Sequence, residues 1–263
     1  MVPPASAEGF LAAGTGTPAG ASEVACSGGE AIAAREVWRG FGRERVLRGV
    51  SLDVPAGAGL AVFGPNGSGK STLLRVLAGL LRPSHGTVVV GGENLFGTPA
   101  ARRRIGYVGH EPMLYGGLTI RENLTLYATL YGLDAPQARI DDMVALLGLG
   151  RYRDTVTARL SRGLAQRAAV ARALLHAPAV LLLDEPFAGL DPDAAAHLAA
   201  HLDDFRGRGG ALVLATHQAG EAARAAGEAR ILRNGRLGAA LRLNGLEAAA
   251  VDAWYQNSAA GAP

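Results

Sequence analysis

The nine residues GPNGSGKST, at positions 64–72, constrain the fold of this chain more than any other stretch. They match the pattern GxxxxGK[ST], follow the apolar run GLAVF at 59–63 and lead into the stretch KSTLLRVLAGL, which has helical periodicity. A strand, a glycine-rich loop and a helix in this order form the turn that holds a polyphosphate with main-chain N–H groups. The sequence therefore predicts a nucleotide-binding α/β fold built around this loop.

Lys70, inside this stretch, is the only lysine among the 26 lysine and arginine side chains. Its compact ammonium can reach the outer phosphates within a curled loop, where the planar guanidinium of arginine would not fit in the same way. The hydroxyl of Ser71 is positioned to bind Mg²⁺. The predicted nucleotide-binding residues of the loop are Gly64, Pro65, Asn66, Gly67, Ser68, Gly69, Lys70, Ser71 and Thr72.

Short apolar runs alternate with helical patterns along the rest of the chain. The strand-length runs are GLAVF, RIGYVG at 104–109, AVLLLD at 179–184 and ALVLAT in the 210s, and three of them are almost continuously apolar. Such runs are typical of strands buried on both faces of a parallel sheet, and their alternation with helices predicts βαβ units. The helical patterns lie at 70–80, 119–131, 137–148, 161–176, 192–207 and 219–226.

The two ends of the chain and one turn carry separate signals. Residues 1–30 contain no basic residue and no unbroken apolar run, so we expect a disordered tail rather than a secretory signal. We also expect the residues from Gln256 to Pro263 to be unstructured. The pair Asn234 and Gly235, between two strand-like segments, predicts a hairpin with a type I′ turn, because both residues tolerate positive φ.

Composition limits the class of protein and of partner. The net charge of +3 comes with arginines that are spread along the chain rather than gathered into a block, so no nucleic-acid partner is expected. Cys26 is the single cysteine, which excludes an internal disulfide or a cysteine-rich metal site and favours a reducing cytoplasm. No segment approaches the roughly 18 consecutive apolar residues that a membrane span requires.

The stretch AVLLLDEPFAGLD, at 179–191, indicates what reaction the nucleotide site performs. Asp184 ends a buried strand, at the edge where ligands of open α/β sheets gather, and can hold Mg²⁺ through a water molecule. Glu185 can deprotonate an attacking water; the alternative is that the two acids cap a helix before Pro186. A second apolar strand leads to His217, a donor or acceptor for the terminal phosphate.

Five motifs follow one another in the order found in the nucleotide-binding subunits of ABC transporters, which the chain resembles over about residues 31–240. They are the loop at 64–72, LSRGLAQR at 160–167, LLLDEP at 181–186, AGLD at 188–191 and ATH at 215–217. The resemblance implies an ATPase with a P-loop, RecA-like α/β core, a mixed sheet and an inserted α-helical subdomain at about 111–176. Residues 241–263, which follow the part of the chain covered by the resemblance, are predicted to form a C-terminal helix and a tail.

The resemblance also implies roles for residues outside the loop. Phe41, in RGFG, matches the aromatic residue that stacks on adenine. Ser161 and Gly163 match the residues that contact the γ-phosphate held by the opposite subunit. Asp191 matches a position at the dimer interface.

Catalysis is implied for Lys70, Glu185 and His217, with His217 linking the γ-phosphate to Glu185. One chain carries half of each composite site, so two cassettes would close head to tail around two ATP molecules with Mg²⁺. Separate transmembrane subunits are the implied partners, and the chain would bind peripherally at the cytoplasmic face of the membrane.

The chain departs from the family pattern at two motifs. In YVGHEP, His110 stands where the family usually has glutamine, in the loop that meets Mg²⁺ and the membrane partner. Imidazole can replace glutamine as a ligand through water or as a donor, which keeps His110 among the predicted ATP and Mg²⁺ ligands. In the signature, Arg162 and Leu164 replace a glycine and a glutamine; Arg162 either adds charge at the interface or points to solvent.

The motifs that contain these departures are similar to those of one subfamily. GHEP, LTIRENL, SRG and DEPFAGLD look like the ATP-binding subunit of the haem exporter of cytochrome c biogenesis. ATP-binding subunits of drug, polysaccharide or lipid exporters share most of these features. A soluble ABC protein of translation or DNA repair is a third alternative, although the short interval between Lys70 and Ser161 leaves no room for a long coiled-coil insertion.

The helical subdomain of the family carries the surface that meets the membrane subunit. In this chain the corresponding apolar residues are Met113, Leu114 and Tyr115, which we expect to contact a short helix of that subunit. His197 and His201 have the spacing of two zinc ligands on a helix, but no third ligand is visible nearby, so a solvated face is the simpler interpretation.

Overall fold

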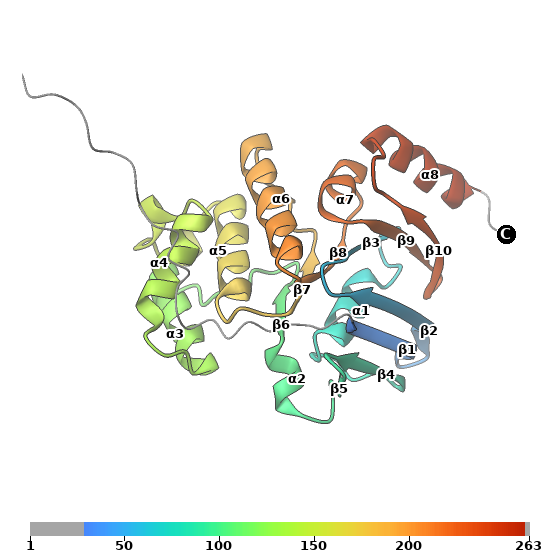
Figure 1. Ribbon diagram of the computed structural model, residues 1–263, viewed down its shortest axis with the longest axis horizontal. Helices are drawn as coiled ribbons and strands as arrows, with labels where there is room; N and C mark the ends of the chain where they lie inside the picture. The colour runs from blue at the N-terminus through green and yellow to red at the C-terminus, as the bar shows by residue number, and fades with distance from the viewer. Residues whose placement is uncertain (1–28, 261–263) are drawn as a thin grey trace, which may run out of the picture.

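The computed structural model describes residues 29–260, in which a six-stranded mixed sheet forms the centre of the molecule (Figure 1). The strand order is β10-β9-β3-β8-β7-β6; all neighbours are parallel except β9 and β10. The predicted α/β core with a mixed sheet is thereby confirmed. The strands are β3 (Gly59–Phe63), β6 (Ile105–Val108), β7 (Val180–Asp184), β8 (Ala211–Ala215), β9 (Glu228–Arg233) and β10 (Arg236–Arg242).

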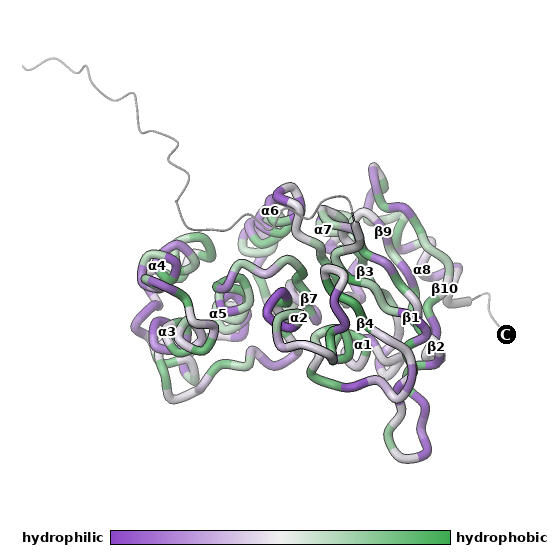
Figure 2. Tube along the Cα trace, turned by 60° about the horizontal axis from the view of Figure 1, so that its bottom comes forward, coloured by the Kyte–Doolittle hydropathy of each residue, from purple (hydrophilic) through white to green (hydrophobic). Residues whose placement is uncertain are grey.

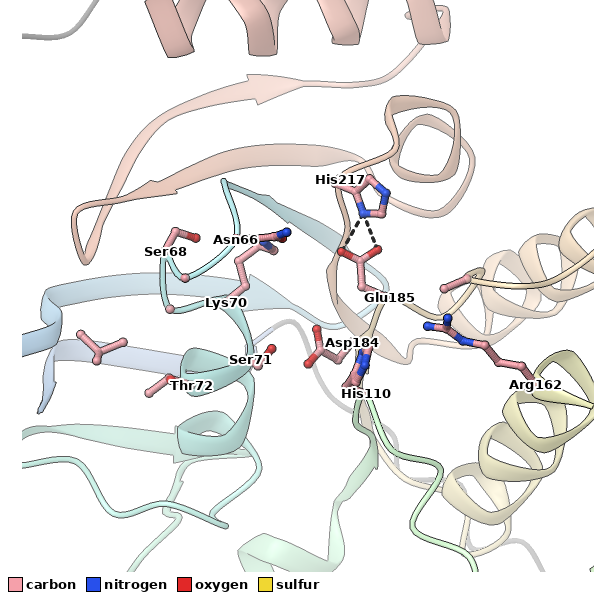
Figure 3. Close-up of a pocket in the computed structure, with 14 residues that line it drawn as sticks. Asn66, Ser68, Lys70, Ser71, Thr72, His110, Arg162, Asp184, Glu185 and His217 are labelled. Atoms are coloured by element: carbon pink, nitrogen blue, oxygen red, sulfur yellow. Dashed lines mark hydrogen bonds and ion pairs between the residues drawn. The ribbon is translucent and has the colours of Figure 1, made fainter. Parts of the chain in front are cut away.

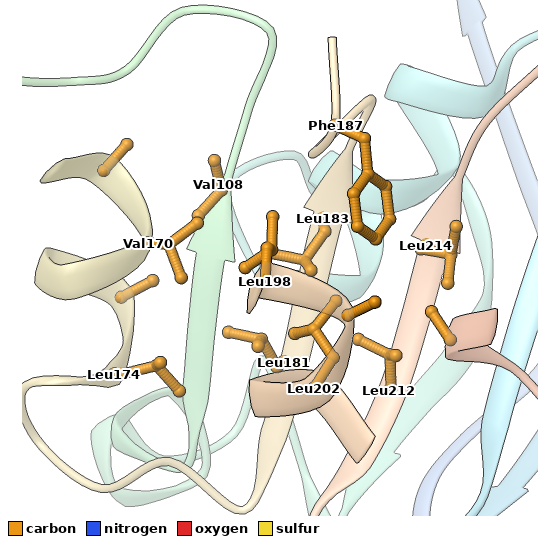
Figure 4. Close-up of a cluster of buried hydrophobic side chains, with 14 of the residues drawn as sticks. Val108, Val170, Leu174, Leu181, Leu183, Phe187, Leu198, Leu202, Leu212 and Leu214 are labelled. Carbon is orange, nitrogen blue, oxygen red and sulfur yellow. The ribbon is translucent and has the colours of Figure 1, made fainter. Parts of the chain in front are cut away.

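The central strands are buried on both faces, as their continuous apolar runs predict. Alternate residues of β7 point to opposite sides, so that Leu181 and Leu183 belong to one core cluster and Val180 and Leu182 to the other. The first cluster meets α6 (Pro192–Gly207) through Leu198 and Leu202 (Figure 4), and the second meets α1 (Lys70–Leu77). Figure 2 shows the hydrophobic colour along β3 and β7 and the hydrophilic colour on α2 (Pro99–Arg103).

A second, four-stranded antiparallel sheet lies beside α1 and was not predicted from the apolar runs. Its strands are β1 (Glu30–Phe41), β2 (Glu44–Pro55), β4 (His85–Val90) and β5 (Glu93–Asn94), in the order β2-β1-β4-β5. Buried and exposed residues alternate along most of β2, since only one face of this sheet is covered. A search for continuous apolar runs therefore misses such strands.

Three helices form a lobe at the side of the core, between β6 and β7 in the chain (Figure 1). They are α3 (Ile120–Tyr131), α4 (Pro136–Leu146) and α5 (Arg162–Leu174), with single turns at Gly150–Tyr152 and Thr157–Arg159. A capping box between Thr119 and Glu122 starts α3, and Gly132 ends it with positive φ. The lobe lies within the predicted helical subdomain.

The C-terminal part holds one confirmed prediction and one that is wrong. Asn234 and Gly235, with φ of 49° and 77°, join β9 to β10 in the predicted hairpin. The residues from Gln256 onward were expected to be unstructured, but α8 (Ala248–Ala260) includes 256–260. Trp254 and Tyr255 of α8 pack against Phe63 at ring-centroid distances of 6.2 and 5.5 Å, which anchors this alanine-rich helix to the core.

The N-terminal prediction and Cys26 lie largely outside the described residues. The strand β1 begins at Glu30, so the last residue assigned to the tail belongs to the sheet. Helix α7 (Ala219–Ala225) follows β8 and packs against α8. Within residues 29–260, none of the helices combines the length and the apolarity that crossing a bilayer demands.

Candidate nucleotide-binding site

A cavity of about 450 Å³ lies where the carboxyl ends of β3, β7 and β8 meet (Figure 3). This is the edge at which parallel α/β sheets bind their ligands. The residues that line it are Val46, Asn66, Gly67, Ser68, Gly69, Lys70, Ser71, Thr72, His110, Arg162, Asp184, Glu185, Ala188 and His217. Most residues predicted from the phosphate loop and from the strand ends are therefore brought together.

The loop between β3 and α1 depends on glycine at two positions. Gly64 has φ of 155°, and a Cβ there would lie 2.4 Å from the carbonyl oxygen of Leu232. Gly69 has φ of 104°, and a Cβ there would lie 2.9 Å from Val46. Only glycine fits both the conformation and the space. The loop thus curls closely enough to present its N–H groups to a ligand at the start of α1, where no side chain caps the helix.

The ammonium of Lys70 is held inside this curled loop. The side chain is buried, and Nζ donates hydrogen bonds to the carbonyl oxygens of Gly64 at 2.7 Å and Pro65 at 3.2 Å. Burial lowers the pKa of Lys70, while the carboxylates of Glu185 and Asp184 act in the opposite direction. The loop therefore keeps a desolvated cation facing the cavity.

Two buried oxygens of the site have no hydrogen-bond partner in the structure. Asp184 is 3% exposed, and its Oδ2 makes no hydrogen bond; the same is true of Oγ of Ser68. A buried carboxylate oxygen without a partner is costly, so such groups usually hold a ligand, an ion or water. One cavity is lined by the carboxylate of Asp184, the hydroxyl of Ser71 and the ammonium of Lys70. This set of groups could bind a polyphosphate together with a divalent cation.

Among the described residues that line this cavity, Glu185 and His217 are the only two that form an ion pair with each other. Nδ1 of His217 lies 2.9 Å from both carboxylate oxygens of Glu185, so the ring donates through Nδ1–H and leaves Nε2 for another partner (Figure 3). Glu185 has φ of 51°, a left-handed conformation that is uncommon for a residue other than glycine. Strained backbone of this kind clusters at functional sites.

His110 and Arg162, the two departures from the family pattern, both line the cavity. His110 is exposed and lies two residues after the end of β6. Arg162 extends from the start of α5 toward the cavity (Figure 3), and its stem packs against Gly189. Arg162 is exposed although it lines the cavity, so the two alternatives for it, a charge at the dimer interface or a side chain directed to solvent, both stay predictions.

Six predicted ligands do not line the cavity: Gly64 and Pro65 at the start of the loop, and four residues elsewhere in the chain. Phe41 is 50% exposed at the end of β1, where the guanidinium of Arg39 lies 5.0 Å from its ring centre. Ser161 caps α5 by accepting from the N–H of Leu164 at 3.3 Å, and Asp191 caps α6. Gly163 packs against the backbone of the loop before α6. Their roles toward adenine and a second subunit stay predictions.

Sequence reasoning missed several residues around the cavity. Val46 belongs to β2, which has no continuous apolar run, and Ala188 has no polar group that draws attention. Thr216 and Glu221 flank His217 and form a hydrogen bond with each other. The spacing T-H-x-x-x-E directly after an apolar strand is the signal that could have revealed them.

Comparison with known proteins places these motifs in one family. The family described as "ABC transporter" matches residues 47–188. A probable anion import ATP-binding protein of Haloferax volcanii is 37% identical over 78% of this chain and 77% of its own length. A cytochrome c biogenesis ATP-binding export protein of Cupriavidus pinatubonensis is 38% identical over 76% of this chain and 91% of its own length.

Other relatives are longer, and solved structures share the fold. The chain covers 58% of a sulfate/thiosulfate import ATP-binding protein of Mycolicibacterium paratuberculosis, which is 37% identical over 79% of this chain. A dimeric ATP-binding cassette in a post-hydrolysis state, bound to ADP and Pi, is 26% identical, has a TM-score of 0.75 and covers 82% of this chain and 100% of its own.

Proposed function

The chain belongs to the ABC transporter family as one of its ATP-binding, ATP-hydrolysing subunits, and on that premise we propose that it is the motor of an exporter. The observation that supports the motor role is the single cavity shared by Lys70, Asp184 and Glu185, because it combines a phosphate-binding cation with two acids; the direction of transport is proposed from the resemblance of the motifs to an exporter subfamily. Such a site can bind a nucleoside triphosphate and activate water against its terminal phosphate.

The side chains divide the work of hydrolysis. Lys70 and the N–H groups of its loop hold the outer phosphates, and Glu185 takes a proton from the attacking water. His217 orients Glu185 through Nδ1 and keeps Nε2 for the terminal phosphate. Asp184 and Ser71 would hold Mg²⁺, with His110 as a further ligand through water; the ion would neutralise charge that develops on the phosphates.

A second cassette would complete the site. The solved relative bound to ADP and Pi is a dimer, which supports the pairing of two chains around nucleotide. Ser161 and Asp191 are exposed in this chain, so both remain accessible to a second copy. The isolated monomer is then expected to hydrolyse ATP poorly.

The partner in the membrane would dock on the loop that leads into the helical lobe. Met113 is 43% and Tyr115 is 55% exposed, although both are large apolar side chains. The hydroxyl of Tyr127 holds this loop by donating to the carbonyl of Met113 at 2.9 Å. An exposed apolar cluster on an ordered loop suits a contact with a helix of a transmembrane subunit at the cytoplasmic face.

The cargo proposed first is haem, exported for cytochrome c biogenesis. The histidine in GHEP and the SRG signature resemble that subfamily, and one relative carries the name of a cytochrome c biogenesis export protein. Exporters of drugs, polysaccharide or lipid fit the same motifs. Import of an inorganic anion is the second candidate, because the names of the relatives from Haloferax and Mycolicibacterium favour it.

Purification from a detergent extract, followed by identification of the membrane proteins that co-purify, tests the proposal. An export-type membrane subunit is expected, and its loss is expected when Met113 and Tyr115 are replaced by aspartate while ATP binding persists. Unchanged co-purification would place the docking surface elsewhere. Recovery of an anion-import membrane subunit would favour the second candidate, and recovery of ribosomes or DNA without membrane protein would favour a soluble ABC protein.

A further inference from the structure

A partly buried hydrogen bond joins the residues on either side of His217, in the turn from β8 into α7. Thr216 is 0% exposed, and its Oγ1 donates to the carboxylate of Glu221 at an oxygen separation of 2.5 Å. The same oxygen accepts from the N–H of Gln218 at 3.1 Å. The two bonds close the residues before and after His217 into one tight turn.

This turn is also tied to the strand that carries the phosphate loop. The N–H of Thr216 donates to the carbonyl oxygen of Val62 in β3 at 3.3 Å, and the N–H of Glu185 donates to the carbonyl oxygen of Ala215 at 2.9 Å. The backbone of Glu185 and the backbone that leads to His217 are therefore fixed to each other. These backbone hydrogen bonds do not determine the orientation of the His217 side chain.

Glu221 is suited to hold the turn because of its surroundings. It lies in the first turn of α7 and is partly buried, and burial raises its pKa, while the hydrogen bond from Thr216 opposes that shift. The charge of Glu185 raises the pKa of Glu221 further, and His217 lowers it. These are the charged groups that face Glu221, so the carboxylate is close to the catalytic pair without lining the cavity.

We propose that Thr216 and Glu221 are positioning residues, whose hydrogen bond aims the His217 ring at the carboxylate of Glu185. This inference rests on the proposed roles of Glu185 and His217 in ATP hydrolysis. Neither residue lines the cavity, so their proposed effect on turnover is exerted through the position of His217. Loss of the bond frees the turn and misplaces Nδ1, and a misplacement of about 1 Å can cost up to about 100-fold in rate.

The test compares steady-state ATP hydrolysis of full-length variants at a protein concentration that permits dimer formation. Thr216→Val keeps the shape of the side chain but removes the hydroxyl, and we expect kcat to fall about tenfold with KM within about twofold of the wild type. Thr216→Ser restores the hydroxyl and is expected to recover kcat. Thr129→Val, at an exposed threonine of α3, is the matched control and is expected to leave kcat unchanged.

A double-mutant cycle separates positioning from a general structural role. In a His217→Ala background, Thr216→Val is expected to lower kcat no further, because the ring it positions is gone. An equal fall in both backgrounds, or an unchanged kcat in Thr216→Val, would overturn the inference. Should Thr216→Val fail to fold, Glu221→Ala against Glu221→Gln decides: the alanine variant alone should lose kcat, and equal values in the two variants would also overturn it.

The wild type distinguishes this inference from the proposed function. If the wild-type protein hydrolyses ATP and the variants match it, only the positioning role fails. If the wild type does not hydrolyse ATP at all, both fail together.

Discussion

Two buried polar side chains, Asn123 at the start of α3 and Asp184 at the end of β7, differ in whether their polar atoms have hydrogen-bond partners. Asn123 is 0% exposed and has partners on both sides of its amide: Nδ2 donates to three carbonyl oxygens and Oδ1 accepts from the N–H of Tyr115. Asp184 is 3% exposed, and its Oδ2 has no partner.

The difference separates structural polar residues from those that hold a ligand. Asn123 adds a second hydrogen bond to carbonyl oxygens that already accept from backbone N–H groups, and its Oδ1 accepts from the N–H of Tyr115, so the polar atoms of its amide all have partners within the chain. Asp184 leaves a buried oxygen open toward a cavity that also contains a cation. Substitutions should therefore weaken folding at the first site and ligand binding at the second.

Glu185→Gln should give the largest effect of these substitutions. It extends the comparison between Asn123 and Asp184 to a residue that should affect the rate of hydrolysis without affecting folding or nucleotide binding. We expect turnover of ATP to fall by about 10²–10⁴-fold, because glutamine cannot accept the proton of the attacking water. Nucleotide affinity should stay within about threefold, since the phosphate-binding groups are intact. Single-turnover hydrolysis and equilibrium binding measure the two quantities, and near-normal turnover would remove Glu185 from its assigned role.

Asp184→Asn tests the ligand side of the comparison directly. The affinity for ATP in the presence of Mg²⁺ should fall on the order of 100-fold, because the substitution removes the buried charge that would hold the ion. Stability without nucleotide should stay the same or rise by about 1 kcal/mol, since an unpartnered buried carboxylate is replaced by a neutral amide. Urea unfolding gives the second value, and a clear loss of stability would show that Asp184 is a structural residue.

Asn123→Ala tests the structural side. The substitution leaves the carbonyl groups of Tyr115, Leu118 and Thr119 without this partner, and we expect a loss of stability on the order of 3 kcal/mol. ATP affinity at a temperature where the variant is folded should match the wild type. A weakened affinity with unchanged stability would reverse the assignment of the two sites.

His176 is an intermediate case and gives the smallest expected effect. Its ring stacks on Tyr131, Nε2 lies 3.1 Å from the carbonyl oxygen of Ile105, and buried Nδ1 has no partner. Burial lowers the pKa of His176 to about 4, below the roughly 6.5 of an unfolded histidine, so the folded state binds fewer protons between these values. Stability should therefore be fully present above pH 6.5 and fall as pH decreases, by about 2 kcal/mol at pH 5.

His176→Phe retains an aromatic ring against Tyr131 and serves as the control. The free energy of unfolding of this variant, measured between pH 7 and pH 5, should fall by less than that of the wild type. Parallel curves for the two proteins would show that His176 does not titrate as its burial implies.

The parts of the fold that could be predicted from sequence are those whose signal is local. The strand at 59–63 and the helix at 192–207 were predicted with the bounds that the structure shows. The strands β1 and β2 were not, because one face of their sheet meets solvent and breaks the apolar run that served as the signal. The end of α8 was missed because its anchors, Trp254 and Tyr255, stabilise it only through contact with distant Phe63.

The candidate site shows the same division. Lys70, Asp184 and His217 follow strands of the sheet, and sequence position alone places them at one edge. The contact between His217 and Glu185, the direction of Arg162 and the bond between Thr216 and Glu221 depend on turns and side-chain rotamers. Such features follow from three-dimensional packing, which no spacing along the chain specifies.

Calorimetric titration of the wild type and of Lys70→Ala with ATP, with and without Mg²⁺, tests the central claim most directly. Binding that requires Mg²⁺ is expected for the wild type, with a loss on the order of 100-fold or more in Lys70→Ala, because the only cation within the curled loop is removed. Binding of equal strength in the two proteins, or wild-type binding that is indifferent to Mg²⁺, would contradict the claim that this cavity holds a magnesium-bound triphosphate.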